Sequence, residues 1–310
     1  MNHYPLSAEL AAFVQRTLSY TSADSSFQGL RDSYERMCRA FTPPRPAGLA
    51  VQELQLAGVP LRLYHPERPA APSGWPWLLY LHGGGWVLGG LDSHEFITAR
   101  LASELGILVI AVDYRLAPEH PFPAAFDDCL GVWRALEQGL LPLPLDPQRR
   151  VLMGDSAGGN LTAALCLALR DAGEPGPAAQ VLVYPGLGGG ANLPSRSECA
   201  DAPLLSSSDL DCFQALYLPG PQHRSAYARP LLAQQFAGLP AAFIALAQFD
   251  PLRDDGERYH QHLLAAGGQS QLYPGLGLVH GCLRARGLAP EVDALYSALL
   301  AYLEQHLGRP

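Results

Sequence analysis

The stretch LMGDSAGGNL, from Leu152 to Leu161, places a single serine among small residues. Ser156 follows an apolar run and precedes a helix-length segment, and Gly154 and Gly158 complete the pattern G-x-S-x-G around it. Where a strand turns sharply into a helix, the residue at the centre of the turn has a strained backbone conformation. The residues two positions before and after it must have small side chains. The pattern alone is common by chance, and its plainer interpretation is a glycine-rich turn that contains a serine. Motifs elsewhere in the sequence are needed to tell whether this turn exposes a reactive hydroxyl.

Short apolar runs recur on both sides of this turn, and helix-length segments lie between them. The runs are WLLYLH, ILVIAV, RVLMG, QVLVY and AFIALA, and the helical segments are residues 95–105, 124–137, 159–172 and 253–266. Two earlier runs, VQELQL and VPLRLYH, alternate like half-buried strands. Strands that alternate with helices predict an α/β fold with a mostly parallel central sheet flanked by helices.

Two segments do not follow this alternation. Residues 1–48 contain two amphipathic stretches, the first after Ser7, a typical N-cap residue, and they end in the proline-rich TPPRPAG. Residues 186–239 contain several prolines and a helical stretch near 208–217. We therefore expect N-terminal helices at 1–48, a main domain at 49–310, and an excursion above the sheet at about 187–235.

Composition excludes several classes of protein. The chain has 310 residues, of which 48% are hydrophobic, so it can bury a large core. Its net charge is −8 and it has no basic run, which argues against a nucleic-acid partner. No run approaches the length of a membrane span, and we expect no secretory signal. The six scattered cysteines predict reduced thiols in a cytoplasmic protein, and the absence of lysine suggests a GC-rich, bacterial genome.

A second glycine-rich loop, LHGGGW at Leu81–Trp86, follows the run WLLYLH. Consecutive glycines let the backbone approach a ligand closely and present unobstructed N–H groups. Because α/β sheets bind ligands at the carboxyl ends of their strands, we expect this loop to lie beside Ser156. A phosphate-binding interpretation fails because no lysine follows either loop. His82 is expected to position the loop rather than to act as a base.

A serine hydroxyl becomes a good nucleophile only when a base takes its proton. His280 follows the strand-like run QLYPG and precedes the last helical segment, which makes it the candidate base. Asp250 follows the apolar run AFIALA, so it is expected on the same sheet edge as Ser156 and is the candidate acid. Asp254 and Asp255 begin the next helical segment, where carboxylates stabilise a helix N-terminus, and we expect no chemistry from them.

Taken together, these motifs resemble the hormone-sensitive-lipase family of α/β-hydrolases, which includes bacterial carboxylesterases. The stretches HGGGW, DYRLAPEHPFPAAFDD, GDSAGGN, ADAPLLSSSDLDCF and LAQFDPLRDDG occur in the order of the family, between Val51 and the C-terminus. The resemblance implies an α/β-hydrolase fold, in which the N-terminal helices at 1–48 and the excursion at about 187–235 form a helical cap over an acyl pocket.

The resemblance also implies roles for individual residues. It assigns the catalytic triad to Ser156, Asp250 and His280, and the oxyanion hole to the amides of Gly84, Gly85 and Ala157. The implied function is a serine carboxylesterase that hydrolyses short- to medium-chain acyl esters through an acyl-enzyme, without a cofactor or metal, as a monomer or homodimer. Two alternatives stay open. One is a non-catalytic small-molecule-binding protein on the same scaffold, and the other is an amidase or peptidase with the same triad.

Three features depart from the family pattern. Gln248 stands where glutamate is usual, Cys282 stands where phenylalanine is usual, and YPGLGLVHG is two residues longer than the common form. The longer loop bears on the placement of His280, and Cys282 beside the base is expected to make activity sensitive to thiol reagents. The prolines of YRLAPEHPFPAA are expected to form rigid turns beneath the site.

Overall fold

The structure, a computed structural model, describes residues 4–220 and 224–308. In this part of the chain, eight strands form one sheet in the order β1-β2-β4-β3-β5-β6-β7-β8. The strands are β1 (Leu49–Leu56), β2 (Val59–Pro66), β3 (Trp75–Leu81), β4 (Leu108–Val112), β5 (Leu145–Asp155), β6 (Ala179–Val183), β7 (Ala241–Ala245) and β8 (Ser270–Tyr273). The pairs β1–β2 and β2–β4 are antiparallel and all the others are parallel, which confirms the predicted α/β class.

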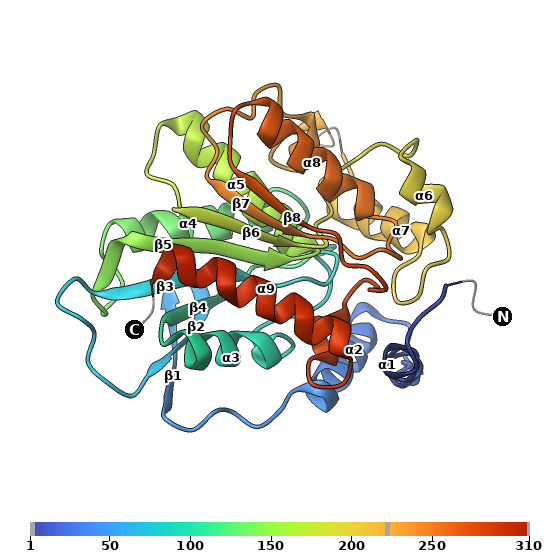
Figure 1. Cartoon of the computed structure of the whole chain (residues 1–310), viewed down its shortest axis with the longest axis horizontal. Coiled ribbons are helices and arrows are strands. Elements are labelled where there is room, and N and C mark those ends of the chain that lie inside the picture. The colour runs from blue at the N-terminus through green and yellow to red at the C-terminus, as the bar shows by residue number, and fades with distance from the viewer. Residues whose placement is uncertain (1–3, 221–223, 309–310) are drawn as a thin grey trace.

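Helices cover both faces of the sheet (Figure 1). They are α1 (Ala8–Leu18), α2 (Phe27–Phe41), α3 (Glu95–Leu105), α4 (Ala124–Glu137), α5 (Ala157–Ala172), α6 (Pro194–Glu198), α7 (Ser207–Tyr217), α8 (Arg253–Ala265) and α9 (Pro290–Leu307), with short 3₁₀ turns η2 (Pro230–Leu232) and η3 (Cys282–Ala285). Buried side chains of α4, α5 and α8 share one core with the sheet, and those of α1, α3 and α9 share the other. None of the described helices is long and apolar enough to cross a bilayer.

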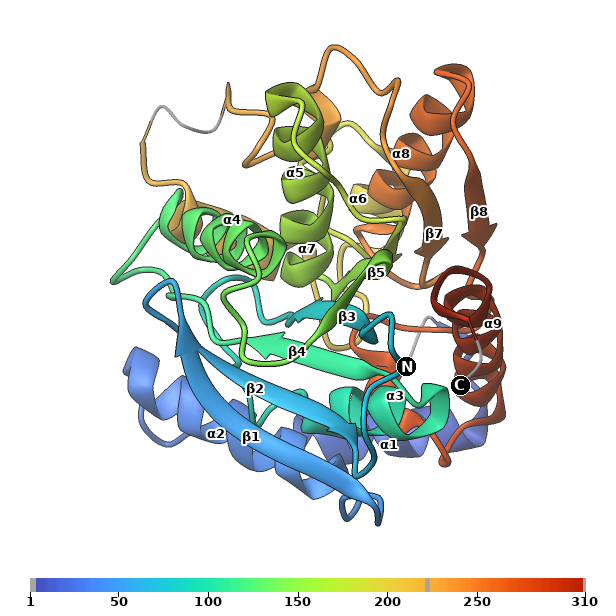
Figure 2. The same cartoon turned by 90° about the vertical axis from the view of Figure 1, so that its left-hand side faces the viewer.

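The two alternating runs form the hairpin β1–β2 at one end of the sheet, and β7 and β8 lie at the other end (Figure 2). The continuous apolar runs became the central strands, whose residues are almost all buried. A strand covered by helices on both faces needs apolar side chains in both directions, whereas an end strand needs them only in one. Strand β5, which ends just before Ser156, lies at the centre of the sheet between β3 and β6.

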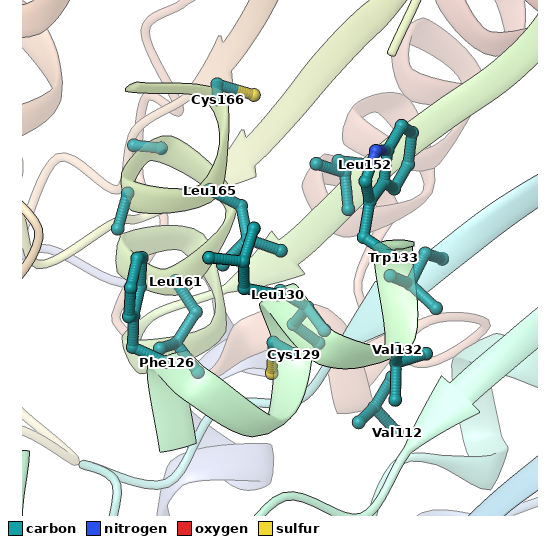
Figure 3. Close-up of a cluster of buried hydrophobic side chains, with 14 of the residues drawn as sticks. Val112, Phe126, Cys129, Leu130, Val132, Trp133, Leu152, Leu161, Leu165 and Cys166 are labelled. Carbon is teal, nitrogen blue, oxygen red and sulfur yellow. The ribbon is translucent and has the colours of Figure 1, made fainter. Parts of the chain in front are cut away.

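Helices α4 and α5 pack side by side on the sheet (Figure 3). Leu130 and Trp133 of α4 and Leu161 and Leu165 of α5 are among the buried side chains of this core. Burying a leucine side chain contributes about 1.5–3 kcal/mol each, so this layer holds the start of α5 firmly against the sheet. The N-terminus of α5 is consequently a fixed platform for whatever stands there.

The segments outside the sheet lie at the edge towards which the parallel strands run. In Figure 1 the arrows of β5 and β6 point to the side of the molecule that holds α1, α2, α6 and α7. Ser7 caps α1 as predicted, because its Oγ accepts a hydrogen bond from the amide of Leu10 at 3.1 Å. Helices α6 and α7 lie between β6 and β7 in the chain, within the segment predicted as an excursion. Residues 1–3 and 221–223 of the predicted cap segments lie outside the described residues.

Candidate active site

Ser156 stands at the junction of β5 and α5 with φ 53° and ψ −116°. This left-handed conformation is costly for a residue with a side chain, and here its amide is held by a 2.8 Å bond to the carbonyl of Val183. A Cβ on Gly154 would lie 2.3 Å from the backbone of Gly158, and one on Gly158 would lie 1.8 Å from the carbonyl of Leu81. The glycines predicted from the motif are therefore required by contact with backbone atoms.

His280 connects Ser156 to Asp250. Its Nε2 lies 2.9 Å from the Oγ of Ser156, and its Nδ1 lies 2.7 Å from Oδ2 of Asp250. Asp250 is fully buried, and its other oxygen accepts a hydrogen bond from the amide of Leu252 at 2.8 Å. A carboxylate on Nδ1 holds the proton there and leaves Nε2 free to accept the serine proton. This arrangement can deprotonate a serine hydroxyl as it attacks a carbonyl.

The three side chains come from neighbouring parallel strands. Ser156 follows β5 directly, whereas Asp250 and His280 follow β7 and β8 after short loops. These two loops are joined by a parallel bridge between Phe249 and Val279, one residue before each functional side chain. The carboxyl ends of parallel strands meet at one edge, which explains how residues so distant in the chain come together.

The longer loop before His280 is anchored by Gln248. The Oε1 of Gln248 accepts a hydrogen bond from the amide of Gly277 at 2.7 Å, and the Gln248 amide donates to the carbonyl of Gly275 at 3.0 Å. The structure therefore accommodates the departure at Gln248 and the two extra residues together, with His280 in contact with Ser156.

Gly84, Gly85 and Ala157 line the same cavity as Ser156 and His280. Gly84 and Gly85 have φ of 123° and 62°, and a Cβ on Gly84 would lie 2.2 Å from the carbonyl of Leu88. Within residues 4–220 and 224–308, the amides of these three residues donate no hydrogen bond to another protein group. They are available to an oxygen atom bound in the cavity.

Asp155 supports the HGGG loop, a role that the sequence analysis missed. Its Oδ1 accepts hydrogen bonds from the hydroxyl of Tyr80 at 2.8 Å and the amide of Gly83 at 3.1 Å, and it lies 3.4 Å from Nε2 of His94. Burial raises the pKa of Asp155, but the charge of His94 and hydrogen bonds from His94 and Tyr80 outweigh it and hold the pKa below its usual value. Its place inside the GDSAG motif was the one available signal, whereas nothing in the sequence pointed to His94.

His82 has the surroundings of a positioning residue. Its ring stacks on Tyr114 with 4.1 Å between ring centroids, and the hydroxyl of Tyr114 donates to the His82 carbonyl at 2.6 Å. Burial, assisted by the charge of His94, lowers the pKa of His82 to about 3. His82 is therefore neutral near pH 7 and its ring holds the first residue of the glycine loop in place.

The cavity over Ser156 has a volume of about 580 Å³. Helix α2 contributes Leu30 and Met37 to its wall, and α7 contributes Leu210 and Phe213. Trp86 lies at the glycine loop and stacks on Tyr217 with 4.2 Å between centroids. Both segments outside the sheet thus supply apolar walls to the space in front of the serine.

Asp255 does more than stabilise the first turn of α8. It is fully buried, its Oδ2 accepts hydrogen bonds from the amides of Leu187 at 2.8 Å and Gly189 at 3.1 Å, and its Oδ1 pairs with Arg196 at 2.5 Å. The prediction that Asp255 lies at the start of a helix is correct, because it stands in the first turn of α8. The contacts with 187–196, which fasten the excursion to the main domain, were not foreseen.

Cys282 is fully buried, and burial raises its pKa to about 12. A thiol that is neither ionised nor accessible reacts slowly with alkylating reagents. The structure therefore opposes the expectation that Cys282 makes the protein sensitive to them. All six cysteines are free, and Cys212 is the exposed one, at the wall of the large cavity. Among the residues that the structure describes, no group of histidine, cysteine, aspartate or glutamate side chains could hold a metal ion.

Comparisons with known proteins agree with this architecture. A family model described as alpha/beta hydrolase fold matches residues 78–284. The carboxylesterase NlhH of Mycobacterium tuberculosis is 37% identical over 300 residues, covering 94% of this chain and 92% of the relative. The ethyl acetate hydrolase of Pseudomonas putida is 37% identical over 251 residues, covering 80% and 79%. The crystal structure of an esterase from the bacterial hormone-sensitive lipase family superposes with a TM-score of 0.87 at 29% identity, covering 98% of this chain and all of that one.

Proposed function

The chain belongs to the hormone-sensitive-lipase family of α/β hydrolases and is a carboxylic ester hydrolase, and on this premise we propose that Ser156, His280 and Asp250 are its catalytic triad. The observation that carries the proposal is the position of His280, 2.9 Å from the Ser156 oxygen and 2.7 Å from the Asp250 carboxylate. A serine hydroxyl, an imidazole and a buried carboxylate in this order form the hydrogen-bonded relay of serine hydrolases.

In the proposed reaction, Ser156 attacks the ester carbonyl while Nε2 of His280 takes its proton. The negative charge that develops on the carbonyl oxygen is stabilised by the amides of Gly84, Gly85 and Ala157, and by the N-terminus of α5. His280 then returns the proton to the leaving alcohol, and an acyl-enzyme remains on Ser156. A water molecule deprotonated by His280 releases the acid and restores the serine.

We propose short- to medium-chain acyl esters as substrates. The cavity of about 580 Å³ has the size of a small-molecule site, and its walls from α2 and α7 are apolar. A relative named for the hydrolysis of ethyl acetate supports the short end of this range. In this proposal residues 1–48 and about 187–235 act as the cap that sets the depth of the acyl pocket.

Replacing Ser156 tests the assignment. We expect Ser156→Ala to lower kcat on p-nitrophenyl butyrate by about four to six orders of magnitude, because the covalent step has no other nucleophile. The melting temperature should change little, and Ser297→Ala, at an exposed serine of α9, should keep wild-type turnover. Near-normal activity of Ser156→Ala would refute the proposed nucleophile.

Two further measurements separate the alternatives. A fluorophosphonate should label the wild type at Ser156 and leave Ser156→Ala unlabelled, whereas a binding protein without catalysis would remain unlabelled in both forms. A matched pair of ester and amide with the same acyl group then distinguishes an esterase from an amidase, and we expect the ester to be hydrolysed far faster.

A further inference from the structure

A second cavity, of about 230 Å³, is lined by four arginines. They are Arg16 of α1, Arg100 of α3, and Arg284 and Arg286 at η3, and we call the space between them the arginine cavity. The other described residues of its wall are uncharged. It lies where α1, the end of α2 and α3 meet the segment that follows His280, and Figure 1 shows these elements together below α9. Arg284 also lines the large cavity over Ser156, so Arg16, Arg100 and Arg286 are the arginines that line the arginine cavity alone.

The protein supplies few acceptors for these guanidinium groups. Arg286 pairs with Glu104 at 2.8 Å through one terminal nitrogen, but its Nη1 is buried without a hydrogen-bond partner. Arg284 is only 8% exposed and its buried Nε also has no partner, but its guanidinium lies beside Gly281 and Tyr34, on the side of the large cavity. Arg100 forms no hydrogen bond or ion pair with any residue that the structure describes. Buried N–H groups of a permanent cation are costly when unsatisfied, so these donors favour an acceptor that enters the cavity.

Arginines without a partner elsewhere in the described residues, such as Arg36, Arg39 and Arg258, are exposed, whereas partly buried ones have acceptors. Arg229, at the wall of the large cavity, donates to the carbonyl of Gly188 at 2.9 and 3.1 Å. Arg134 and Arg150 each pair with a glutamate. Glu104, four residues after Arg100, is the carboxylate nearest in sequence to an arginine of the cavity. Of the four arginines that line the cavity, it contacts Arg286 alone.

Aromatic rings hold three of the four side chains in fixed orientations. The guanidinium carbon of Arg16 lies 4.5 Å from the ring centre of Phe41, and that of Arg286 lies 4.2 Å from the ring of Tyr296. Arg284 lies 6.0 Å from the ring of Phe13. A ring contacts the face of a guanidinium and leaves the N–H groups at its edge free to donate. The stacking therefore orients the guanidinium groups without using their donors, of which Arg16 already gives one to the carbonyl of Ala40 at 2.9 Å.

We propose that the arginine cavity binds a phosphate-type oxyanion, either inorganic phosphate or the phosphate group of a phosphomonoester. A tetrahedral oxyanion offers acceptor oxygens in several directions, which suits guanidinium groups that come from three different elements. The negative charge offsets the repulsion between the arginines. Binding would join α1 and α3 to the segment behind His280. The proposal does not depend on the esterase assignment, because none of its tests measures ester hydrolysis.

The test is binding of inorganic phosphate to the full chain at constant ionic strength, with sodium chloride as the exchanged salt. Titration calorimetry should show saturable binding at one site, and phosphate should raise the melting temperature above that in chloride. Arg100→Gln should weaken the affinity about tenfold or more, because it removes a charged donor. Arg100 has no partner to lose, so the melting temperature of this variant in chloride should not fall.

Arg16→Gln, at an exposed side chain, is the second variant and should also weaken phosphate binding. Arg134→Gln is the matched control, because it removes an exposed arginine on α4, which packs on the other face of the sheet, and it should bind phosphate like the wild type. Glycerol 3-phosphate in place of phosphate distinguishes a phosphomonoester site from a site for the free ion, and tight binding of either supports the proposal. Equal effects of phosphate and chloride, or unchanged affinity in both Arg100→Gln and Arg16→Gln, would overturn it.

Discussion

The side-chain oxygen of Gln248 accepts a hydrogen bond from the amide of Gly277 at 2.7 Å, and this contact links the two loops that carry Asp250 and His280. The hydrogen bond from Gly277 to Gln248 thus restrains the longer loop before His280. We expect Gln248→Ala to lower kcat about tenfold with a smaller change in KM, because a loosened loop holds the imidazole less often in the reactive position. Gln248→Glu keeps the acceptor and should retain most of the activity. Equal kcat for wild type and Gln248→Ala on a chromogenic butyrate ester would contradict this.

Two helical glycines should respond in opposite ways to alanine. In Gly158→Ala the new methyl would lie 1.8 Å from the Leu81 carbonyl, and backbone atoms cannot give way, so we expect a loss of about 3 kcal/mol or more in the free energy of unfolding. In Gly131→Ala, within α4, the methyl meets only Ala57 at 3.9 Å. This variant should gain about 1 kcal/mol from helix propensity. Urea denaturation measures both, and a stable Gly158→Ala would show that the tight turn can relax.

His82 should make stability depend on pH. Its pKa is about 3 in the folded protein against the usual 6.5, since burial disfavours the charged ring. The stability that neutral His82 contributes is fully present above pH 6.5 and is lost as the pH falls from there towards 3. The loss is about 1.4 kcal/mol for each pH unit in that window. His82→Phe keeps a ring against Tyr114 and should flatten the profile of unfolding free energy, whereas His120→Gln, at an exposed histidine, should keep the wild-type slope.

Iodoacetamide should modify Cys212 and spare Cys282. Cys212 is exposed at the wall of the large cavity, whereas Cys282 is fully buried with a pKa of about 12. Peptide mass spectrometry of the treated native protein identifies the labelled thiol. Any loss of esterase activity should disappear in Cys212→Ser and persist in Cys282→Ser. Labelling of Cys282 in the folded protein would mean that the segment after His280 opens far more often than its burial suggests.

Local patterns predicted the elements well because each element follows local rules. The helix at 124–137 begins and ends where its apolar spacing indicates, and Ser7 caps α1 through its own side chain. Some starts differ from the prediction, since α5 begins at Ala157 rather than at residue 159 and β5 begins at Leu145, ahead of the run RVLMG. Glycines usually indicate a turn, but Gly158 lies in the first turn of α5, where the nearby carbonyl of Leu81 leaves no room for a side chain.

The part of the candidate site that consists of recognisable sequence motifs could be predicted. The spacing of strands and motifs correctly brought Ser156, Asp250 and His280 to one edge, although their catalytic roles remain a proposal. Contacts between distant segments could not be predicted from the sequence. An example is the hydrogen bond from the amide of Leu187 to Asp255. No local pattern encodes such a pairing, because it depends on how the excursion returns to the sheet.

Strands β6 and β7 are neighbours along their full length, with Ala179 beside Ala241 and Val183 beside Ala245, although the entire excursion separates them in the chain. The chain thus leaves the sheet and re-enters it one strand away. Recombination can exploit this geometry, because a cassette exchanged here replaces a wall of the pocket without shifting any strand register. The crossover point belongs after Arg196, so that the fastening to Asp255 stays with the parent scaffold. If the proposed triad and cap are correct, we expect chimeras built in this way to take their substrate range from one parent and their catalytic residues from the other.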